Sequence, residues 1–149
     1  PIKSSAASDV YKRQPDTMTI FSKIINGEIP CYKIAEDDRF IAFLDVNPVA
    51  PGHTLVVPKH EVSYLFDLSD EEYTGLELFA KKVALGLRQA VPCKRIGEAV
   101  IGLEVPHAHI HLIPITTEAD MDFHNKKTLP GEEMERLQKI ISAAVAAHM

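Results

Sequence analysis

One nine-residue stretch of this chain, Pro106–Pro114, constrains its fold more than any other and reads PHAHIHLIP. Histidines and apolar residues alternate along it. Because successive side chains of a β-strand point to opposite faces, the spacing predicts a strand over His107–Ile115. The imidazoles of His107, His109 and His111 would share one polar face. The apolar residues between and after them would be buried on the other face: Ala108, Ile110 and Leu112.

Three imidazoles in a row are suited to binding and attacking a phosphate. Imidazole is neutral and nucleophilic near pH 7, and its cation can contact an anionic oxygen. A metal site is the alternative, since two histidines spaced by one residue can bind zinc. The three positions span about 13 Å at about 3.3 Å per residue, so they cannot all reach one ion. A metal would need two of them and ligands from elsewhere, and the phosphate interpretation is favoured.

The composition fits one ordinary globular domain. Hydrophobic residues make up 46% of the chain and charged residues 25%. No apolar run approaches the ~20 residues that cross a membrane. The net charge of −5 disfavours wide electrostatic capture of nucleic acid. Cys31 and Cys93 lie far apart, which argues against a disulfide framework or a Cys-rich zinc site and favours a cytoplasmic location.

Two parts of the chain are expected to differ in order. Residues 1–17 show no apolar period and lack the apolar core of a secretory signal, so we expect a disordered or artefactual leader before a start at Met18, with an authentic targeting peptide as the alternative. Residues 18–149 are expected to form a single domain.

Helix signals occur at three places in that domain. A short helix over Ser22–Asn26 is closed by Gly27. A long helix opens at Ser69, which forms a capping box with Glu72, and stops before Pro92. A terminal helix is expected over 131–148. Strands are expected over 31–36, 40–44, 54–58, 95–101 and 107–115. The prediction is an α+β domain with a mostly antiparallel five-stranded sheet, a long helix and a C-terminal helix.

The alternating stretch resembles the signature of the histidine triad (HIT) family, His-x-His-x-His followed by apolar residues. Two more segments resemble the family and occur in its order. Thr19–Pro30 resembles the usual opening helix, and Asp45–Lys59 resembles a strand–loop–strand segment with a fourth histidine, His53. The resemblance, which is to the Hint-like branch, implies a HIT-like fold. It also implies a homodimer formed through the long helix and an edge strand.

The resemblance also implies the chemistry of the histidines. His109 would attack the α-phosphorus of a nucleotide and form a nucleotidyl-imidazole that water then hydrolyses. His107 would orient the next imidazole. His111 and His53 would contact the phosphate oxygens and stabilise charge during transfer.

The nucleoside side of the site follows from the same resemblance. Asp45 would accept hydrogen bonds from the ribose hydroxyls, with a role as a turn residue before Asn47 as the alternative. The apolar base cleft would consist of Phe21, Ile24, Phe43 and Val46, each of which is otherwise an ordinary core residue. Glu104 stands in the loop before the triad, where the family usually has a polar donor. It would act on the leaving group as an acid or face away.

The zinc-binding branch of the family has cysteines near positions 19 and 22 and a histidine after the Pro-Lys pair. This chain has Thr19, Ser22 and Glu61 there. We therefore expect no structural zinc, unless His60 takes that role, and no cofactor.

The sequence thus predicts a nucleotide hydrolase or transferase that cleaves at the α-phosphate of purine nucleotide adducts, of the nucleoside phosphoramidase type. Two alternatives stay open: a dinucleoside polyphosphate hydrolase, and a nucleotide-binding regulatory protein with weak turnover. The expected partner is a small purine nucleotide, with no nucleic acid and no membrane. Lys126 and Lys127 could reach a polyphosphate tail or lie in a solvated loop.

Overall fold

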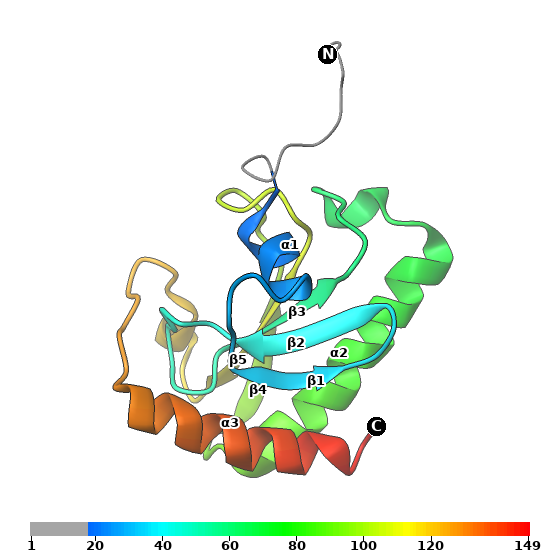
Figure 1. Ribbon diagram of the computed structural model, residues 1–149. Helices are drawn as coiled ribbons and strands as arrows, with labels where there is room; N and C mark the ends of the chain where they lie inside the picture. The colour runs from blue at the N-terminus through cyan, green and yellow to red at the C-terminus, as the bar shows by residue number, and fades with distance from the viewer. Residues whose placement is uncertain (1–17) are drawn as a thin grey trace.

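The computed structural model describes residues 18–149, so the expected leader at 1–17 lies outside the described residues. Figure 1 shows the order of the elements along the chain. The strands are β1 (Lys33–Glu36), β2 (Phe40–Leu44), β3 (Thr54–Pro58), β4 (Arg95–Ala99) and β5 (Ile110–Ile115). The α-helices are α1 (Ile20–Ile25), α2 (Asp70–Ala90) and α3 (Gly131–Ala146), and the 3-10 helices are η2 (Leu65–Asp67) and η3 (Glu118–Met121).

The five strands form one antiparallel sheet in the order β1-β2-β3-β5-β4. This confirms the predicted α+β fold with a five-stranded sheet, a long helix and a C-terminal helix. The central strand β3 pairs with β5, so that Leu55 stands opposite His111. β4 forms one edge of the sheet. Within residues 18–149, no helix combines the length and apolarity that a membrane crossing requires.

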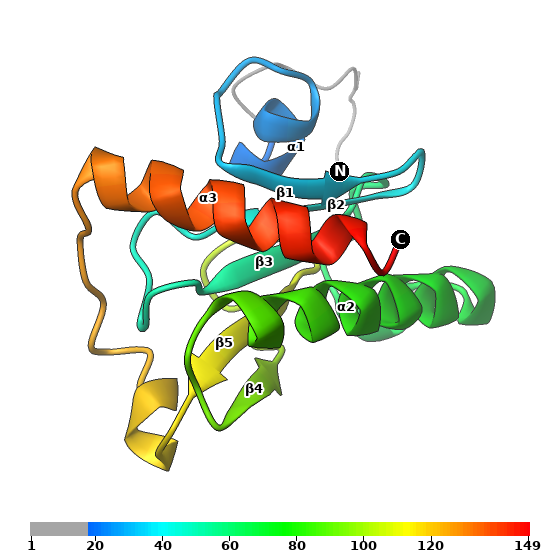
Figure 2. The same cartoon turned by 90° about the horizontal axis from the view of Figure 1, so that it is seen from below.

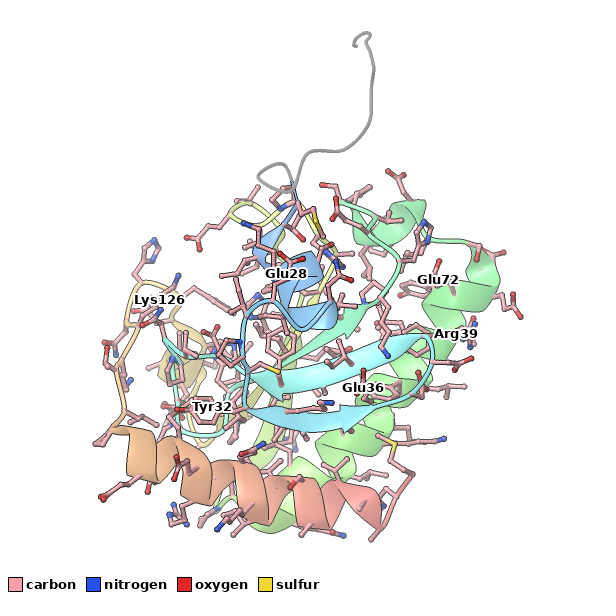
Figure 3. All side chains as sticks on the ribbon, viewed as in Figure 1. Glu28, Tyr32, Glu36, Arg39, Glu72 and Lys126 are labelled. Carbon is pink, nitrogen blue, oxygen red and sulfur yellow. The ribbon has the colours of Figure 1, made fainter. Side chains whose placement is uncertain are left out.

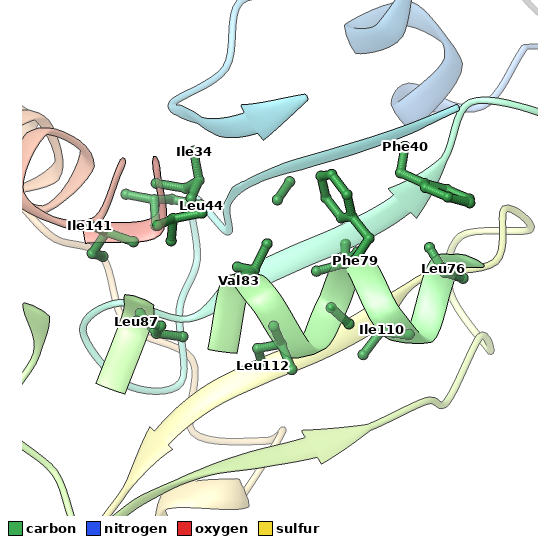
Figure 4. Close-up of a cluster of buried hydrophobic side chains, with 14 of the residues drawn as sticks. Ile34, Phe40, Leu44, Leu76, Phe79, Val83, Leu87, Ile110, Leu112 and Ile141 are labelled. Atoms are coloured by element: carbon green, nitrogen blue, oxygen red, sulfur yellow. The ribbon is translucent and has the colours of Figure 1, made fainter. Parts of the chain in front are cut away.

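One face of the sheet is covered by α2 and α3, which lie side by side in front of it in Figure 2. The apolar period of α2 predicts this, because a helix buries the stripe that faces the core. Figure 4 shows side chains of α2 interleaved with those of β2 and β5. Fully buried members of this layer include Leu76, Val83, Leu87, Ile110 and Ile141.

The opposite face of the sheet carries α1 and two smaller apolar clusters. Phe21 of α1 packs with Ile41 and Phe43 of β2 and with two residues of β3. A second cluster combines Val49, Ala50 and Ile113. His111 belongs to this face, because Ile110 and Leu112 on either side of it pack in the α2 layer. The predicted alternation is therefore confirmed.

The strand that carries the triad is shorter than predicted. β5 begins at Ile110 rather than at His107. The N–H groups of His107 and Ala108 donate outside the sheet, His107 to the nearby Val105 carbonyl and Ala108 to the distant Val62 carbonyl, so neither joins the ladder. Two other strands are also shorter than predicted: β1 starts at 33 rather than 31, and β4 ends at 99 rather than 101.

The helix starts follow their capping residues. α1 begins at Ile20 rather than Ser22, because the Thr19 side chain accepts the Ser22 N–H as an N-cap. Ser69 caps α2 by accepting the Glu72 N–H at 3.1 Å. The Glu72 carboxylate pairs instead with the exposed His60 imidazole 3.2 Å away. The Ser69 half of the predicted capping box is therefore formed, while the Glu72 side chain is engaged elsewhere. α3 ends at Ala146, two residues before the predicted position.

Candidate active site

The three triad imidazoles are buried, and they do not form the open polar face that the alternation suggested. His107, His109 and His111 are 0%, 6% and 9% exposed. The ring centroids of His109 and His111 lie 4.8 Å apart, and the Phe21 ring lies 4.9 Å from that of His109. Phe123 packs on the other side of His111, with centroids 4.8 Å apart. Two aromatic side chains from distant segments thus cover the row.

His107 is held by hydrogen bonds on both ring nitrogens. Its Nε2 lies 2.8 Å from the Pro58 carbonyl oxygen, and its Nδ1 lies 2.8 Å from the Thr19 hydroxyl. A carbonyl can only accept, so the proton sits on Nε2 and the Thr19 hydroxyl donates to Nδ1. This ring therefore joins α1, the end of β3 and the triad, rather than facing a substrate.

His109 has a defined tautomer. Its Nδ1 lies 2.7 Å from the His107 carbonyl oxygen, which fixes the proton on Nδ1 and leaves the lone pair on Nε2. Burial lowers the pKa of His109, and the hydrogen bond to the His107 carbonyl acts in the opposite direction. The lowered pKa keeps the imidazole neutral at pH 7. A neutral imidazole with a lone pair on Nε2 is a nucleophile.

A chain of hydrogen bonds joins His53 to His111 and fixes the tautomers of both rings. The Val49 N–H donates to His53 Nδ1 at 3.1 Å, so the proton of His53 sits on Nε2 and is donated to His111 Nδ1 at 2.9 Å. His111 must then carry its own proton on Nε2. Burial, with the neighbouring imidazole charge, lowers the pKa of His53 to about 3 and that of His111 to about 4. Both rings are neutral at pH 7.

In this chain of hydrogen bonds, His53 lies behind His111. His53 is only 2% exposed, and both of its nitrogens are engaged within the protein. The direct contact with phosphate oxygens expected of both histidines is thus open to His111, while His53 sets the tautomer of His111. A periodicity argument could not reveal this, because the two residues lie 58 positions apart.

A tight turn delivers His53 to the site. The His53 N–H donates to the Ala50 carbonyl at 3.0 Å, with Pro51 and Gly52 between them. Gly52 has φ of 92°, the left-handed conformation that favours glycine at this position of a type II turn. A Cβ at Gly52 would also lie 3.1 Å from the Val91 side chain. The glycine therefore serves both the turn and the packing beneath it.

Asp45 serves a turn and also faces the histidines. Its Oδ1 accepts the Asn47 N–H at 2.9 Å, while its Oδ2 lies 3.7 Å from His53 Nε2. Burial raises the pKa of Asp45, and the hydrogen bond from Asn47 opposes that shift. Both interpretations of this residue from the sequence are therefore compatible with its position.

The same residues form a candidate metal cluster, but their protons do not suit one. Ligand atoms of Asp45, His53 and His111 lie within 4.8 Å of one another. An ion bound to His53 Nε2 would require the proton of that ring to move to Nδ1. The Val49 N–H already points at Nδ1, so two donors would face each other. This donor set fits a neutral hydrogen-bonded pair better than a metal.

The positions discussed for structural zinc are also joined by hydrogen bonds. The Ser22 hydroxyl donates to the Glu61 carboxylate, and Thr19 bonds to His107. Two neutral hydroxyls replace the thiolates that zinc prefers, so these residues do not fit a structural zinc ion. His60 pairs with a carboxylate of α2 instead of turning toward them.

Three of the four residues expected to form the base cleft lie in one apolar cluster, which contacts His109 through Phe21. Phe21 and Phe43 pack edge to face with centroids 5.6 Å apart, and both are buried. Ile24 is half-buried against the same cluster. Val46 is exposed, in the loop that follows Asp45. The structure therefore places one of these side chains, Phe21, against His109, with Phe43 and Ile24 packed in the same cluster and Val46 outside it.

Glu104 does not point into the row of imidazoles. Its side chain is 81% exposed, and its Oε1 lies 3.2 Å from Lys126 Nζ. Figure 3 labels Lys126 on the loop that precedes α3. Sequence reasoning identified neither this pair nor the contacts of Thr19 and Phe123. Thr19 carried a usable signal as an N-cap before an apolar helix, whereas nothing local marks Phe123.

Comparisons with known proteins show the family and the fold of this chain. A family model described as "HIT domain" matches residues 26–118. The chain is 36% identical over 138 residues to an uncharacterized HIT-like protein of Borreliella burgdorferi, covering 83% of this chain and 95% of that protein. It is 38% identical over 100 residues to the adenosine 5′-monophosphoramidase of Saccharomyces cerevisiae, covering 66% of this chain and 63% of that enzyme. A crystal structure of a Hit-like protein from Bartonella henselae superimposes with a TM-score of 0.76 at 34% identity, covering 89% and 99% of the two chains.

Proposed function

This chain belongs to the HIT family, and on that premise we propose that it is a hydrolase acting on nucleoside 5′-phosphate derivatives. We propose further that its substrates are purine nucleoside phosphoramidates, cleaved at the α-phosphate through a nucleotidyl-histidine intermediate. The similarity to the yeast adenosine 5′-monophosphoramidase supports the class of reaction. The observation that carries the mechanism is the tautomer of His109, whose lone pair is held on Nε2.

The first step forms a bond between His109 Nε2 and the α-phosphorus. The P–N bond to the leaving amine breaks, and the amine takes up one proton from solvent. His109 then carries a positive charge, because Nδ1 keeps its proton while Nε2 is bonded to phosphorus. The His107 carbonyl oxygen, 2.7 Å from Nδ1, stabilises that charge. In the second step, water attacks phosphorus and releases one proton to solvent, the Nε2–P bond breaks with its electron pair returning to Nε2, and the nucleoside monophosphate leaves.

The remaining polar groups bind and orient the nucleotide in this proposal. The Nε2–H of His111 donates to a phosphate oxygen, and His53 holds it in that tautomer. Asp45 accepts hydrogen bonds from the ribose hydroxyls, using the oxygen lone pairs that are not engaged by the Asn47 N–H. The base packs against Phe21 and Phe43, which are already locked by their mutual contact.

The test is AMP release from adenosine 5′-phosphoramidate by the wild type and by His109→Asn. The asparagine amide can still donate to the His107 carbonyl, because it reproduces Nδ1 but has no atom at Nε2. We expect turnover to fall by at least about a thousandfold. The matched control is His124→Asn, since His124 is fully exposed. Full activity of His109→Asn would contradict the proposed nucleophile, and AMP binding without turnover by the wild type would favour a regulatory protein.

We also propose that residues 18–149 form one domain that pairs with a second copy. The edge strand β4 lies next to α2, which exposes Leu78 and Leu85. An open edge with exposed apolar side chains beside it favours association. Sedimentation equilibrium should give twice the chain mass. The free Cys31 and Cys93 support a cytoplasmic location in this proposal.

A further inference from the structure

The loop that carries Lys126 is fixed against the site, while the side chain of Lys126 is partly exposed. The neighbouring Lys127 donates from its backbone N–H to the Pro48 carbonyl and from Nζ to the Val49 carbonyl, each at 2.8 Å. Phe123, in the same loop, packs on His111 with centroids 4.8 Å apart. The backbone of Lys126 is therefore held between the hydrogen bonds of Lys127 and the contact of Phe123 with His111.

Lys126 meets Glu104 from the opposite loop. Their charged atoms lie 3.2 Å apart, and the side chains are 45% and 81% exposed. Burial has the largest effect on the pKa values of Asp45, His53 and His111. The positive charge of Lys126 has a smaller effect and lowers the pKa of each. The opposite charges thus stand together at the edge of the site.

Within residues 18–149, the imidazoles of the site do not provide a strong cation for a charged leaving group, and the ammonium of Lys127 is engaged by the Val49 carbonyl. The pKa values of His53, His109 and His111 are all lowered, chiefly by burial, so these imidazoles are neutral at pH 7. They can donate hydrogen bonds to the transferred phosphate, but they bring no net positive charge. Lys126 brings one, on the side of the site where Phe123 and His111 meet.

We propose that Lys126 is a specificity-determining residue that binds an anionic group, a carboxylate or a phosphate, on the leaving group of the substrate. At rest, Glu104 occupies its ammonium group. An exposed ion pair of this kind contributes little free energy, so an incoming anion can replace the carboxylate. This inference rests on the proposed hydrolase function and adds the charge of the leaving group to it.

The experiment uses two substrates that differ in one charge: the adenosine 5′-phosphoramidates of glycine and of glycinamide, each linked through nitrogen. We expect the wild type to favour the glycine compound, and Lys126→Gln to reduce the ratio of the two kcat/KM values about fivefold. Glu104→Gln should raise the ratio, since it removes the competing carboxylate. Lys139→Gln, at an exposed position on α3, is the matched control and should leave the ratio unchanged.

A second arm separates the two kinds of anion. Diadenosine tetraphosphate presents phosphate instead of carboxylate, and a loss confined to it in Lys126→Gln would assign the residue to polyphosphates. An unchanged glycine to glycinamide ratio together with unchanged tetraphosphate cleavage would overturn the inference while leaving the hydrolase intact. Absence of wild-type turnover on every substrate, including adenosine 5′-phosphoramidate, would overturn the proposed function and this inference with it.

Discussion

Acid should destabilise the fold through the buried His53–His111 pair. Both imidazoles have lowered pKa values in the folded protein, about 3 and about 4, against the ordinary 6.5 of the unfolded chain. Between pH 6.5 and about 4 the unfolded state therefore binds protons that the folded state does not. Stability is fully retained above pH 6.5 and is lost as the pH falls. From pH 7 to pH 5 each neutral, buried histidine removes about 2 kcal/mol from the free energy of unfolding.

Replacement of His111 by asparagine isolates this effect. The Asn side-chain oxygen can still accept the His53 Nε2–H, but it cannot be protonated. The free energy of unfolding should be measured by urea titration at pH 7, 6 and 5, followed by circular dichroism because the chain has no tryptophan. The loss of stability between pH 7 and pH 5 should be smaller by about 2 kcal/mol in His111→Asn than in the wild type.

The comparison between proteins matters because other groups titrate in the same range. Burial and the neighbouring Glu98 raise the pKa of Glu77 to about 7, which stabilises the folded state as the pH falls. That contribution is common to both proteins and cancels in the difference. His124→Asn should show the wild-type pH dependence, because its side chain is fully exposed. If the free energy of unfolding changed equally with pH in His111→Asn and the wild type, the buried His53–His111 pair would not be the cause of the acid destabilisation.

Three further substitutions test separate parts of the structure. Gly86→Ala should destabilise the protein by about 1–3 kcal/mol in urea titrations, because a Cβ would lie 2.5 Å from a backbone atom of α3, whereas Gly131→Ala meets nothing within 4 Å and should not. Glu98→Gln should lower the pKa of Glu77, as measured by NMR titration of its carboxyl carbon. Thr19→Val should cost about 1–3 kcal/mol of stability, because it removes a buried hydroxyl that binds an imidazole, and Thr19→Ser should restore it.

The sequence was sufficient to predict the sheet and its helices because periodicity reports directly on burial. Alternation around His109 predicted that Ile110 and Leu112 are buried on the face opposite the histidines, and the structure has them in the α2 layer. Capping signals were less complete. Thr19 caps α1, which begins at Ile20, two positions before the predicted Ser22, and its hydroxyl also bonds to His107, 88 residues away.

The arrangement of the site exceeded what periodicity can predict. A repeat of two gives the face on which a side chain lies, but not the partner that its ring nitrogens find. His53 therefore appeared equivalent to His111 in the sequence, although a single backbone N–H, that of Val49, places it behind. Phe123 and the Glu104–Lys126 pair come from loops, whose mutual approach depends on tertiary contacts.

The most direct test of the account is to identify the covalent intermediate. The wild type would be mixed with adenosine 5′-phosphoramidate, quenched within the first turnover in alkaline denaturant, digested and mapped by mass spectrometry. The account predicts an adenylyl group on His109 and on no other residue, and none in His109→Asn. An adenylyl group on a different residue, or steady AMP release with no trapped adduct at any quench time, would contradict it.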